Sequence, residues 1–141
     1  MNMFSALEIS ATAMRAQRIR AEVVTANMAN AETTRTEQGG PYQRKQVVFA
    51  ASRFQRQFAG TPGASAQAVR VVGVVQDPTP PQMRYEPSHP DANAQGLVAY
   101  PAIDPVAEMA DLMSAVRSYQ MNASAVNATK QMIQQSLDLI R

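Results

Sequence analysis

Apolar residues recur at alternating spacings of three and four along the C-terminal part of the chain. Such a spacing places them on one side of an α-helix, at the a and d positions of a heptad repeat. The pattern predicts a helix from Pro105 to Ile140, about 50 Å long at 1.5 Å per residue, with Asp104 capping its first free amides. With Lys130 as the exception, this C-terminal seam is apolar or aromatic and consists of Met109, Leu112, Val116, Tyr119, Ala123, Val126, Lys130, Ile133, Leu137 and Ile140.

The N-terminal segment has the same spacing on one face and a second apolar line beside it. Two apolar faces need more than one neighbour, so the segment is expected to pair with the C-terminal helix and with further helices. Eight alanines from Ala6 to Ala31 keep the side chains on both faces small, so that other helices can approach closely. The predicted assembly interface consists of Phe4, Leu7, Ala11, Met14, Asn27 and Asn30 on the N-terminal helix, and of Met109, Leu112, Val116, Tyr119, Ala123, Val126, Ile133 and Leu137 on the C-terminal helix.

Between the helices the hydrophobic period changes to that of strands. Residues 42–49 alternate in part, residues 69–77 are apolar and β-branched, and residues 83–85 form a third, shorter candidate. Gly39, Gly40 and Pro41 form a joint at which the chain changes direction. Residues 50–68 are rich in alanine, glutamine and glycine and are expected to form a mobile loop, with a short helix around residues 53–58.

Together these elements predict a mainly α fold. Long antiparallel N- and C-terminal helices are expected to form a coiled-coil-like hairpin, with a small β-rich ribbon inserted between them. The expected helical core domain comprises the N-terminal helix, residues 1–36, and the C-terminal helix, residues 102–141, and the β-rich insertion comprises residues 37–101. Two or three strands alone cannot bury both of their faces, so they are expected to pack on the helices or on another copy of the chain.

The formal net charge of +2 conceals a separation of charge along the chain. Residues 1–75 hold nine basic and four acidic side chains, whereas residues 76–141 hold four and seven. The two parts are expected to neutralise each other. The alternative is a basic helical protein that binds nucleic acid, with an affinity that falls steeply with salt. Few aromatic residues interleave with the N-terminal arginines, however, and acidic residues interrupt them.

No residue pattern in the chain favours catalysis. There is no cysteine, and the one histidine, His89, lies between Ser88 and Pro90, where capping of a turn is favoured over metal binding. No nucleophile, phosphate-binding or zinc-protease motif occurs. Glu86 and Asp91 could form a carboxylate pair like that of a glycosidase, but two acidic residues in a loop are common and the sequence indicates no cleft. We therefore expect no enzyme activity, cofactor, metal or small-molecule substrate.

The first twenty residues do not resemble a Sec-type signal peptide. No basic residue precedes Arg15, and Glu8 interrupts the apolar stretch. No run approaches the roughly 20 apolar residues that a membrane span needs. The chain is expected to be soluble or to be exported by another route.

Four segments of the chain carry a resemblance to a known family. The segment "ANMANAETT", residues 26–34, resembles a motif shared by the axial rod and hook proteins of the bacterial flagellum. The segments "GGPYQRKQVVF" (39–49), "SHPDAN" (88–93) and "SYQMNASAVNATK" (118–130) are similar to the member of that family that belongs to the proximal rod. The similarity covers about 100 residues of the chain. Glu32 stands where the family has a second asparagine, Met28 where it has leucine or isoleucine, and residues 50–68 have no counterpart in it.

The resemblance implies a structural subunit of the flagellar basal body. Its terminal helices would pair antiparallel and pack with neighbouring subunits into a hollow tube that crosses the periplasm and transmits motor torque for motility. The implied partners are other flagellar rod proteins, copies of the chain itself, the membrane ring of the basal body and the flagellar type III export apparatus. Export without a cleaved signal peptide and the absence of a nucleic-acid partner are implied as well.

Two hypotheses for Asn27 and Asn30 stay open at this point. Amide side chains can satisfy both donors and acceptors of a neighbouring backbone, and polar residues at an interface between helices fix its register. Under that hypothesis the two asparagines set the register between subunits. Under the other they only end the N-terminal helix, since asparagine is common at helix ends.

Overall fold

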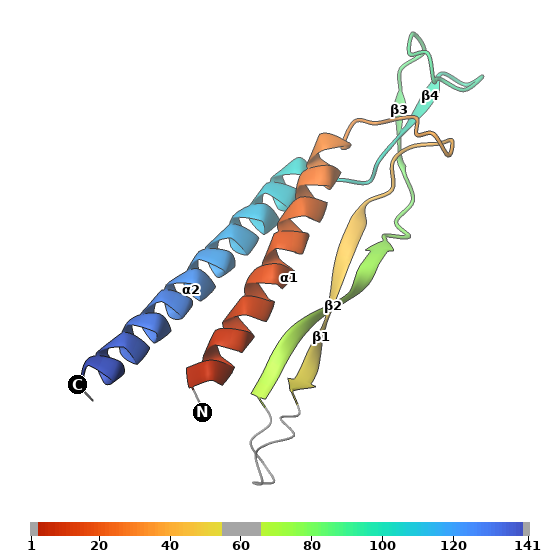
Figure 1. The fold of residues 1–141 in the computed structure, drawn as a ribbon. Coiled ribbons are helices and arrows are strands. Elements are labelled where there is room, and N and C mark those ends of the chain that lie inside the picture. The colour runs from red at the N-terminus through yellow and green to blue at the C-terminus, as the bar shows by residue number, and fades with distance from the viewer. Residues whose placement is uncertain (1–2, 55–65, 140–141) are drawn as a thin grey trace. The chain divides into compact units, whose positions relative to one another are not determined.

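The computed structural model describes residues 3–54 and 66–139 of the chain. In these residues a helix is followed by strands and then by a second helix (Figure 1). β1 pairs with β2, and β3 pairs with β4, so that the strands form separate two-stranded sheets. The elements are α1 (Met3–Ala29), β1 (Lys45–Phe54), β2 (Ala66–Gln76), β3 (Gln82–Tyr85), β4 (Leu97–Tyr100) and α2 (Pro105–Asp138).

The chain divides into two compact units, and each unit combines helix and strand segments. Unit 1 comprises Met1–Ile19, Val48–Gly73 and Ser114–Arg141. Unit 2 comprises Arg20–Val47 and Val74–Met113. Both helices therefore contribute residues to both units.

Unit 1 has a core of small side chains. Ala16 of α1, Ala68 of β2 and Ala115 of α2 are buried. Thr129 of α2 is buried as well, and its hydroxyl donates to the carbonyl oxygen of Ala125 (2.8 Å). Small side chains let elements approach closely, but each of them makes few contacts, so the unit is held by many weak interactions.

Unit 2 buries larger side chains. Its apolar core consists of Val24, Val98, Tyr100 and Ile103. β3 and β4 pair antiparallel with Gln82 opposite Tyr100 and Tyr85 opposite Leu97, and every residue of β3 is exposed while β4 alternates in burial. β4 is therefore the strand that anchors this small sheet to the core of the unit.

The predicted mainly α class is wrong, because the chain folds as a mixture of helices and strands. β1 continues to Phe54 and β2 begins at Ala66, so both strands extend into the segment 50–68 that was predicted as a loop. Strand propensity depends on cross-strand packing more than on local sequence, which is why the alanines and glutamines at these ends gave no signal. The predicted mobility and short helix of the remaining part, residues 55–65, lie outside the described residues.

The ends of the helices differ in how well the sequence predicted them. α2 begins at Pro105 as predicted, and Asp104 caps it, because its Oδ1 accepts a hydrogen bond from the amide of Val106 (2.9 Å). α1 ends at Ala29 rather than at residue 36. There the amide of Asn30 is shared between the carbonyl oxygens of Ala26 (3.1 Å) and Asn27 (3.2 Å), a tightening that is typical of a helix end.

Neither helix of the described chain combines the length and apolarity that a membrane span needs.

Candidate functional site

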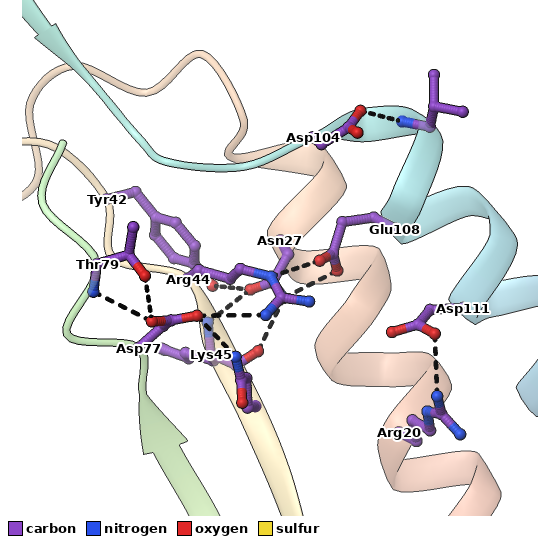
Figure 2. A network of polar contacts seen from close by, with 12 residues as sticks. Arg20, Asn27, Tyr42, Arg44, Lys45, Asp77, Thr79, Asp104, Glu108 and Asp111 are labelled. Carbon is purple, nitrogen blue, oxygen red and sulfur yellow. Dashed lines mark hydrogen bonds and ion pairs between the residues drawn. The ribbon is translucent and has the colours of Figure 1, made fainter. Parts of the chain in front are cut away.

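A cluster of polar side chains in unit 2 joins the end of α1, the start of α2 and the first residues of β1 (Figure 2). At its centre lie Asn27 and Glu108, each only 1% exposed. Buried polar groups are costly unless they are hydrogen-bonded, so the partners of these two side chains decide what the cluster contributes. We call this cluster, Asn27, Tyr42, Arg44, Lys45, Asp77 and Glu108, the polar clamp.

Asn27 uses the whole hydrogen-bonding capacity of its amide within the chain. Its Nδ2 donates to the carbonyl oxygen of Lys45 (2.8 Å) and to Oε2 of Glu108 (3.0 Å). Its Oδ1 accepts from the amide of Lys45 (2.9 Å) and from the hydroxyl of Tyr42 (3.2 Å). An amide side chain has two donor hydrogens and two acceptor positions. Asn27 thus pairs with the backbone of Lys45 as a neighbouring peptide group would, and ties α1 to the start of β1.

Arg44 lies between two carboxylates and links α2 to the end of β2 (Figure 2). Its Nε donates to Oε1 of Glu108 (2.6 Å), and its Nη1 donates to Oδ2 of Asp77 (3.3 Å). The amide of Asp77 donates in turn to the carbonyl oxygen of Arg44 (2.7 Å). Since a buried carboxylate needs a compensating charge, Arg44 is the residue that allows Glu108 to lie in the core of unit 2.

The pKa values of the clamp follow from these contacts. Burial lowers the pKa of Arg44, but the hydrogen bonds and charges of Glu108 and Asp77 raise it above its ordinary value. The hydroxyl of Thr79 (2.6 Å) and its amide (3.1 Å) both donate to Asp77 and hold the pKa of that carboxyl below its ordinary value. Burial, and after it the charge of Glu108, raises the pKa of Tyr42. Arg44 and Asp77 therefore stay charged at neutral pH, and the tyrosine stays protonated.

Two further contacts within unit 2 surround the clamp. Arg20 of α1 forms an ion pair with Asp111 of α2, with 3.0 Å between Nη2 and Oδ1. The hydroxyl of Thr34 donates to Oδ2 of Asp91 (2.8 Å), which connects the segment after α1 to the loop between β3 and β4. The end of α1 is thus fixed to α2 and to that loop by side chains that are far from it in sequence.

The predicted joint forms a tight turn in the same unit. Gly39 and Gly40 have φ values of 84° and 76°, which residues with a Cβ rarely adopt. The turn is closed by hydrogen bonds from the amide of Thr36 to the carbonyl oxygen of Gly40 (2.9 Å) and from the amide of Tyr42 to that of Thr33 (3.0 Å). The joint therefore sets the direction in which the chain enters β1.

The structure brings only one of the predicted interface residues into the clamp. Asn27 is there, whereas the side chain of Asn30 makes local contacts, donating to the carbonyl oxygen of Ala26 (2.9 Å) and accepting from the hydroxyl of Thr33 (3.2 Å). On α1, Phe4 is exposed at 59%, Ala11 is exposed too, and Leu7 and Met14 are half-buried.

On α2 the predicted seam is largely open. Met109, Val116, Tyr119 and Leu137 are 53%, 44%, 43% and 61% exposed. Leu112, Ala123, Val126 and Ile133 are half-buried. The side of α2 that is buried instead carries Glu108, Ala115 and Thr129, which are seven and fourteen residues apart.

Sequence reasoning missed Arg44, Asp77 and the buried position of Glu108. A glutamate in the first turn of a helix is usually a solvent-exposed charge that favours the positive end of the helix dipole, whereas Glu108 is buried. Its spacing of seven from Ala115, and the further residues Asn122 and Thr129 on the same line, are the signal that marks a buried face. The pairing of Arg44 with Asp77 spans 33 residues and left no local signal.

The hydrogen bonds and ion pairs of the clamp hold segments of the chain together. No group of three or more histidine, aspartate or glutamate side chains that could hold a metal ion occurs in residues 3–54 and 66–139. His89, the predicted turn residue, accepts a hydrogen bond from the amide of Asp91 at its Nδ1 (3.1 Å), which confirms the predicted turn.

Comparison with known proteins places the helical segments that build the clamp in one class. Residues 7–35 match the family described as "Flagella basal body rod protein". Residues 94–139 match the family described as "Flagellar basal body rod FlgEFG protein C-terminal". Both matches fall on a helix and the segment that leads out of it or into it. The chain is thus in the class of flagellar rod proteins.

The full-length relatives narrow this class. The flagellar basal-body rod protein FlgC of Bacillus subtilis is 40% identical, and the alignment covers 99% of each chain. FlgC of Escherichia coli O6:H1 is 38% identical over 99% of this chain and 98% of its own. FlgC of Borreliella burgdorferi is 34% identical over 100% and 99%. The chain belongs to the FlgC family of flagellar basal-body rod proteins. As the resemblance implied, it is a structural subunit of the rod and assembles with other rod proteins.

Proposed function

We propose that this rod subunit is part of the proximal rod, the section next to the membrane ring of the basal body. In this role it assembles with copies of itself and with other axial proteins into a tube. The tube crosses the periplasm and transmits motor torque towards the hook. The subunit reaches its site through the flagellar type III export apparatus and has no catalytic role.

The open seam of α2 is the observation that carries this proposal. Four of its large side chains, Met109, Val116, Tyr119 and Leu137, keep between 43% and 61% of their surface exposed. A line of exposed apolar groups along a helix is typical of a surface that another protein covers. Val106, Met113, Met121 and Met132 of the same helix are exposed as well. Helices of neighbouring subunits are the partners that such a long apolar line fits.

The polar clamp supports the proposal in a second way. Transmission of torque needs subunits that do not bend where segments meet. The clamp joins α1, α2, β1 and the end of β2 in unit 2 by hydrogen bonds and ion pairs between 2.6 and 3.3 Å. Since Asn27 has no spare hydrogen-bonding capacity, its contribution to assembly is to hold the shape of the subunit. Asn30, whose contacts are local, is the asparagine that stays available as a register residue.

The proposal is tested by mass spectrometry of basal bodies purified from the source bacterium. Recovery of the chain together with ring and rod components is expected, and deletion of its gene should leave cells non-motile and without external filaments. Motility should return with the wild-type gene in trans. Purified basal bodies that contain the other rod proteins but lack this chain would contradict the proposal.

A further inference from the structure

The two units carry opposite charge. The ranges of unit 1 hold eight basic and two acidic residues, which gives a formal charge of +6, whereas those of unit 2 hold five and nine, which gives −4. Opposite charges of the two parts of the sequence, residues 1–75 and 76–141, were expected to neutralise each other within one chain. Four ion pairs agree with this, because each joins a basic residue of the first part to an acidic residue of the second: Arg20 and Asp111, Arg35 and Asp91, Arg44 and Asp77, and Arg44 and Glu108. All four lie inside unit 2.

Unit 1 contains a groove whose walls carry part of this positive charge. The groove has a volume of about 510 Å³ and lies between α1 and the strands β1 and β2. Arg15 lines it from α1 and Arg70 from β2, and both are exposed. Within residues 3–54 and 66–139 neither arginine has an ion-pair partner. Glu8 is the acidic residue among the lining side chains, so the groove keeps an excess of positive charge.

Unit 2 contains a preformed turn with an unpaired carboxylate at its tip. Glu37 and Gln38 are exposed in the turn that leads into the joint. The hydroxyl of Thr36 donates to the carbonyl oxygens of Gly39 and Gly40 (3.3 Å each), and the amide of Gly39 donates to the carbonyl oxygen of Thr36 (3.0 Å). Over the described part of the chain Glu37 forms no ion pair. Because the turn is already ordered, its docking would cost little conformational entropy.

We propose that the groove of unit 1 receives the Glu37 turn of a second copy of this chain. Glu37 then lies between Arg15 and Arg70, and Gln38 enters the groove beside it. The occupant is a second copy because one chain carries both complementary surfaces, the positive groove and the negative turn. A contact between two different surfaces of identical subunits is head-to-tail and continues from copy to copy, as a rod requires. The inference rests on the proposed function, since it assumes that copies of the chain are neighbours in the rod.

The charges make this contact selective for one orientation. Complementary charges at an interface fix which surfaces meet and raise the rate of encounter. Contacts between two units 1 or two units 2 would place like charges together and are disfavoured. Unlike the apolar seam of α2, this contact therefore determines the direction in which copies add to one another.

Disulfide cross-linking tests the contact directly, because the chain has no cysteine of its own. Ser52→Cys places a thiol in the groove, since Ser52 lines it, and Gln38→Cys places one at the tip of the turn. The two single variants are produced together in a deletion strain, so that a disulfide between positions 52 and 38 has to join two copies. Such a bond requires Cα atoms within about 7 Å. After oxidation of purified basal bodies, we expect a heterodimer with this linkage by mass spectrometry.

The matched control replaces Ser52→Cys by Gln135→Cys, on an exposed part of α2 in the same unit that does not line the groove. No heterodimer with Gln38→Cys is expected there. Basal bodies that contain both the 52 and 38 variants but no linkage between them would overturn the contact and leave the proposed function intact. A disulfide from position 52 to a different rod protein would overturn the choice of a second copy. Absence of both variants from basal bodies would contradict the proposed function and the contact together.

Charge reversal gives an independent readout. Arg70→Glu and Glu37→Arg should each reduce the diameter of the swimming zone by about half or more, and the double variant, which exchanges the two charges, should restore it. Arg117→Glu makes the same change of charge at an exposed position of α2 in unit 1 that lies outside the seam, and it should leave swimming nearly unchanged. Equal loss in the single and double variants would contradict a direct pairing of these two residues.

Discussion

At the scale of single residues, the side-chain amide of Asn27 pairs with the backbone of Lys45 as a peptide group of a neighbouring strand would. It exchanges hydrogen bonds with both the amide and the carbonyl oxygen of Lys45, at 2.9 and 2.8 Å. Since buried peptide groups need partners, the asparagine allows β1 to begin directly against α1. Its remaining bonds to Glu108 and Tyr42 connect α2 and the joint to the same point.

Asn27→Ala is expected to lower the free energy of unfolding by about 2–4 kcal/mol, because it leaves the backbone of Lys45 and the hydroxyl of Tyr42 unpaired in the clamp. Urea denaturation of the full chain, followed by circular dichroism, measures the effect. Asn30→Ala is the matched control and should cost less than about 1 kcal/mol, since its contacts are local. Equal midpoints for the two variants would contradict a central role of Asn27.

The lowered pKa of Asp77 makes the clamp sensitive to acid. Because its folded-state pKa lies below the value of about 3.9 in an unfolded chain, ionised Asp77 stabilises the fold at neutral pH, and this contribution is lost as the pH falls through the folded-state pKa. Asp77→Asn should therefore be less stable than the wild type near neutral pH, yet lose less stability between about pH 5 and pH 2.

Thr79→Ala refines this test, because the hydroxyl of Thr79 is the main cause of the lowered pKa of Asp77. Removal of this hydroxyl should raise the pH at which the protein loses stability in acid, while the hydrogen bond from the amide of residue 79 to Asp77 remains. Thermal unfolding at a series of pH values gives the dependence of stability on pH for Asp77→Asn and for Thr79→Ala. Acid profiles of the two variants that coincide with that of the wild type would show that Asp77 does not contribute.

At the scale of elements, the joint between α1 and β1 depends on glycine for its backbone. Gly40 has a φ of 76° and open space where a Cβ would lie, so a substitution there is opposed by the backbone conformation alone. Gly40→Ala should cost about 1–2 kcal/mol. Gly73 in β2 has equally open space without a positive φ, and Gly73→Ala should stay within about 0.5 kcal/mol of the wild type. Thermal melts of both variants compare them, and similar melting temperatures would contradict strain at the joint.

The sequence predicted those elements whose signals are local. The cap at Asp104, the start of α2 at Pro105 and the two long strands were recognisable from periodicity and from residues next to the element. β4 was missed, although residues 83–85 of its partner β3 were recognised as a candidate strand, because the pairing partner of β4 is more than ten residues away and leaves no local signal. The fold class was misjudged for the same reason, since the strength of the α2 pattern outweighed strands that are stabilised by distant partners.

The contacts of Asn27 in the polar clamp could not be predicted from the sequence either, because its partners are distant along the chain. The motif around Asn27 was visible in the sequence, but its bonds reach Lys45 across 18 residues and Glu108 across 81. No spacing rule connects such positions. The hydrogen-bonding capacity of the Asn27 amide is used within the chain, a role that neither of the two hypotheses for this residue included.

At the scale of the whole molecule, one face of α2 is buried within the subunit and another is exposed. The line of Glu108, Ala115 and Thr129 is buried within the subunit, whereas the seam with Val116 and Tyr119 stays open. Small residues on the inner face allow close packing within the chain. Under the proposed function, the large residues of the open face supply apolar area to a neighbour, and the heptad pattern marks this face rather than the coiled-coil-like hairpin that it was expected to form.

This division predicts that the seam can be changed with little effect on folding and a large effect on assembly. Tyr119 is 43% exposed, so Tyr119→Lys should lower the free energy of unfolding by less than about 1 kcal/mol. It should nevertheless abolish swimming, because a charge in an apolar contact between helices has no partner there. Ser114→Lys is the matched control, since Ser114 is also exposed and lies on the side of α2 away from the seam. Soft-agar motility and the amount of each variant in purified basal bodies measure assembly. Normal rods with Tyr119→Lys, or an equal defect with Ser114→Lys, would show that the seam is not the surface through which subunits meet.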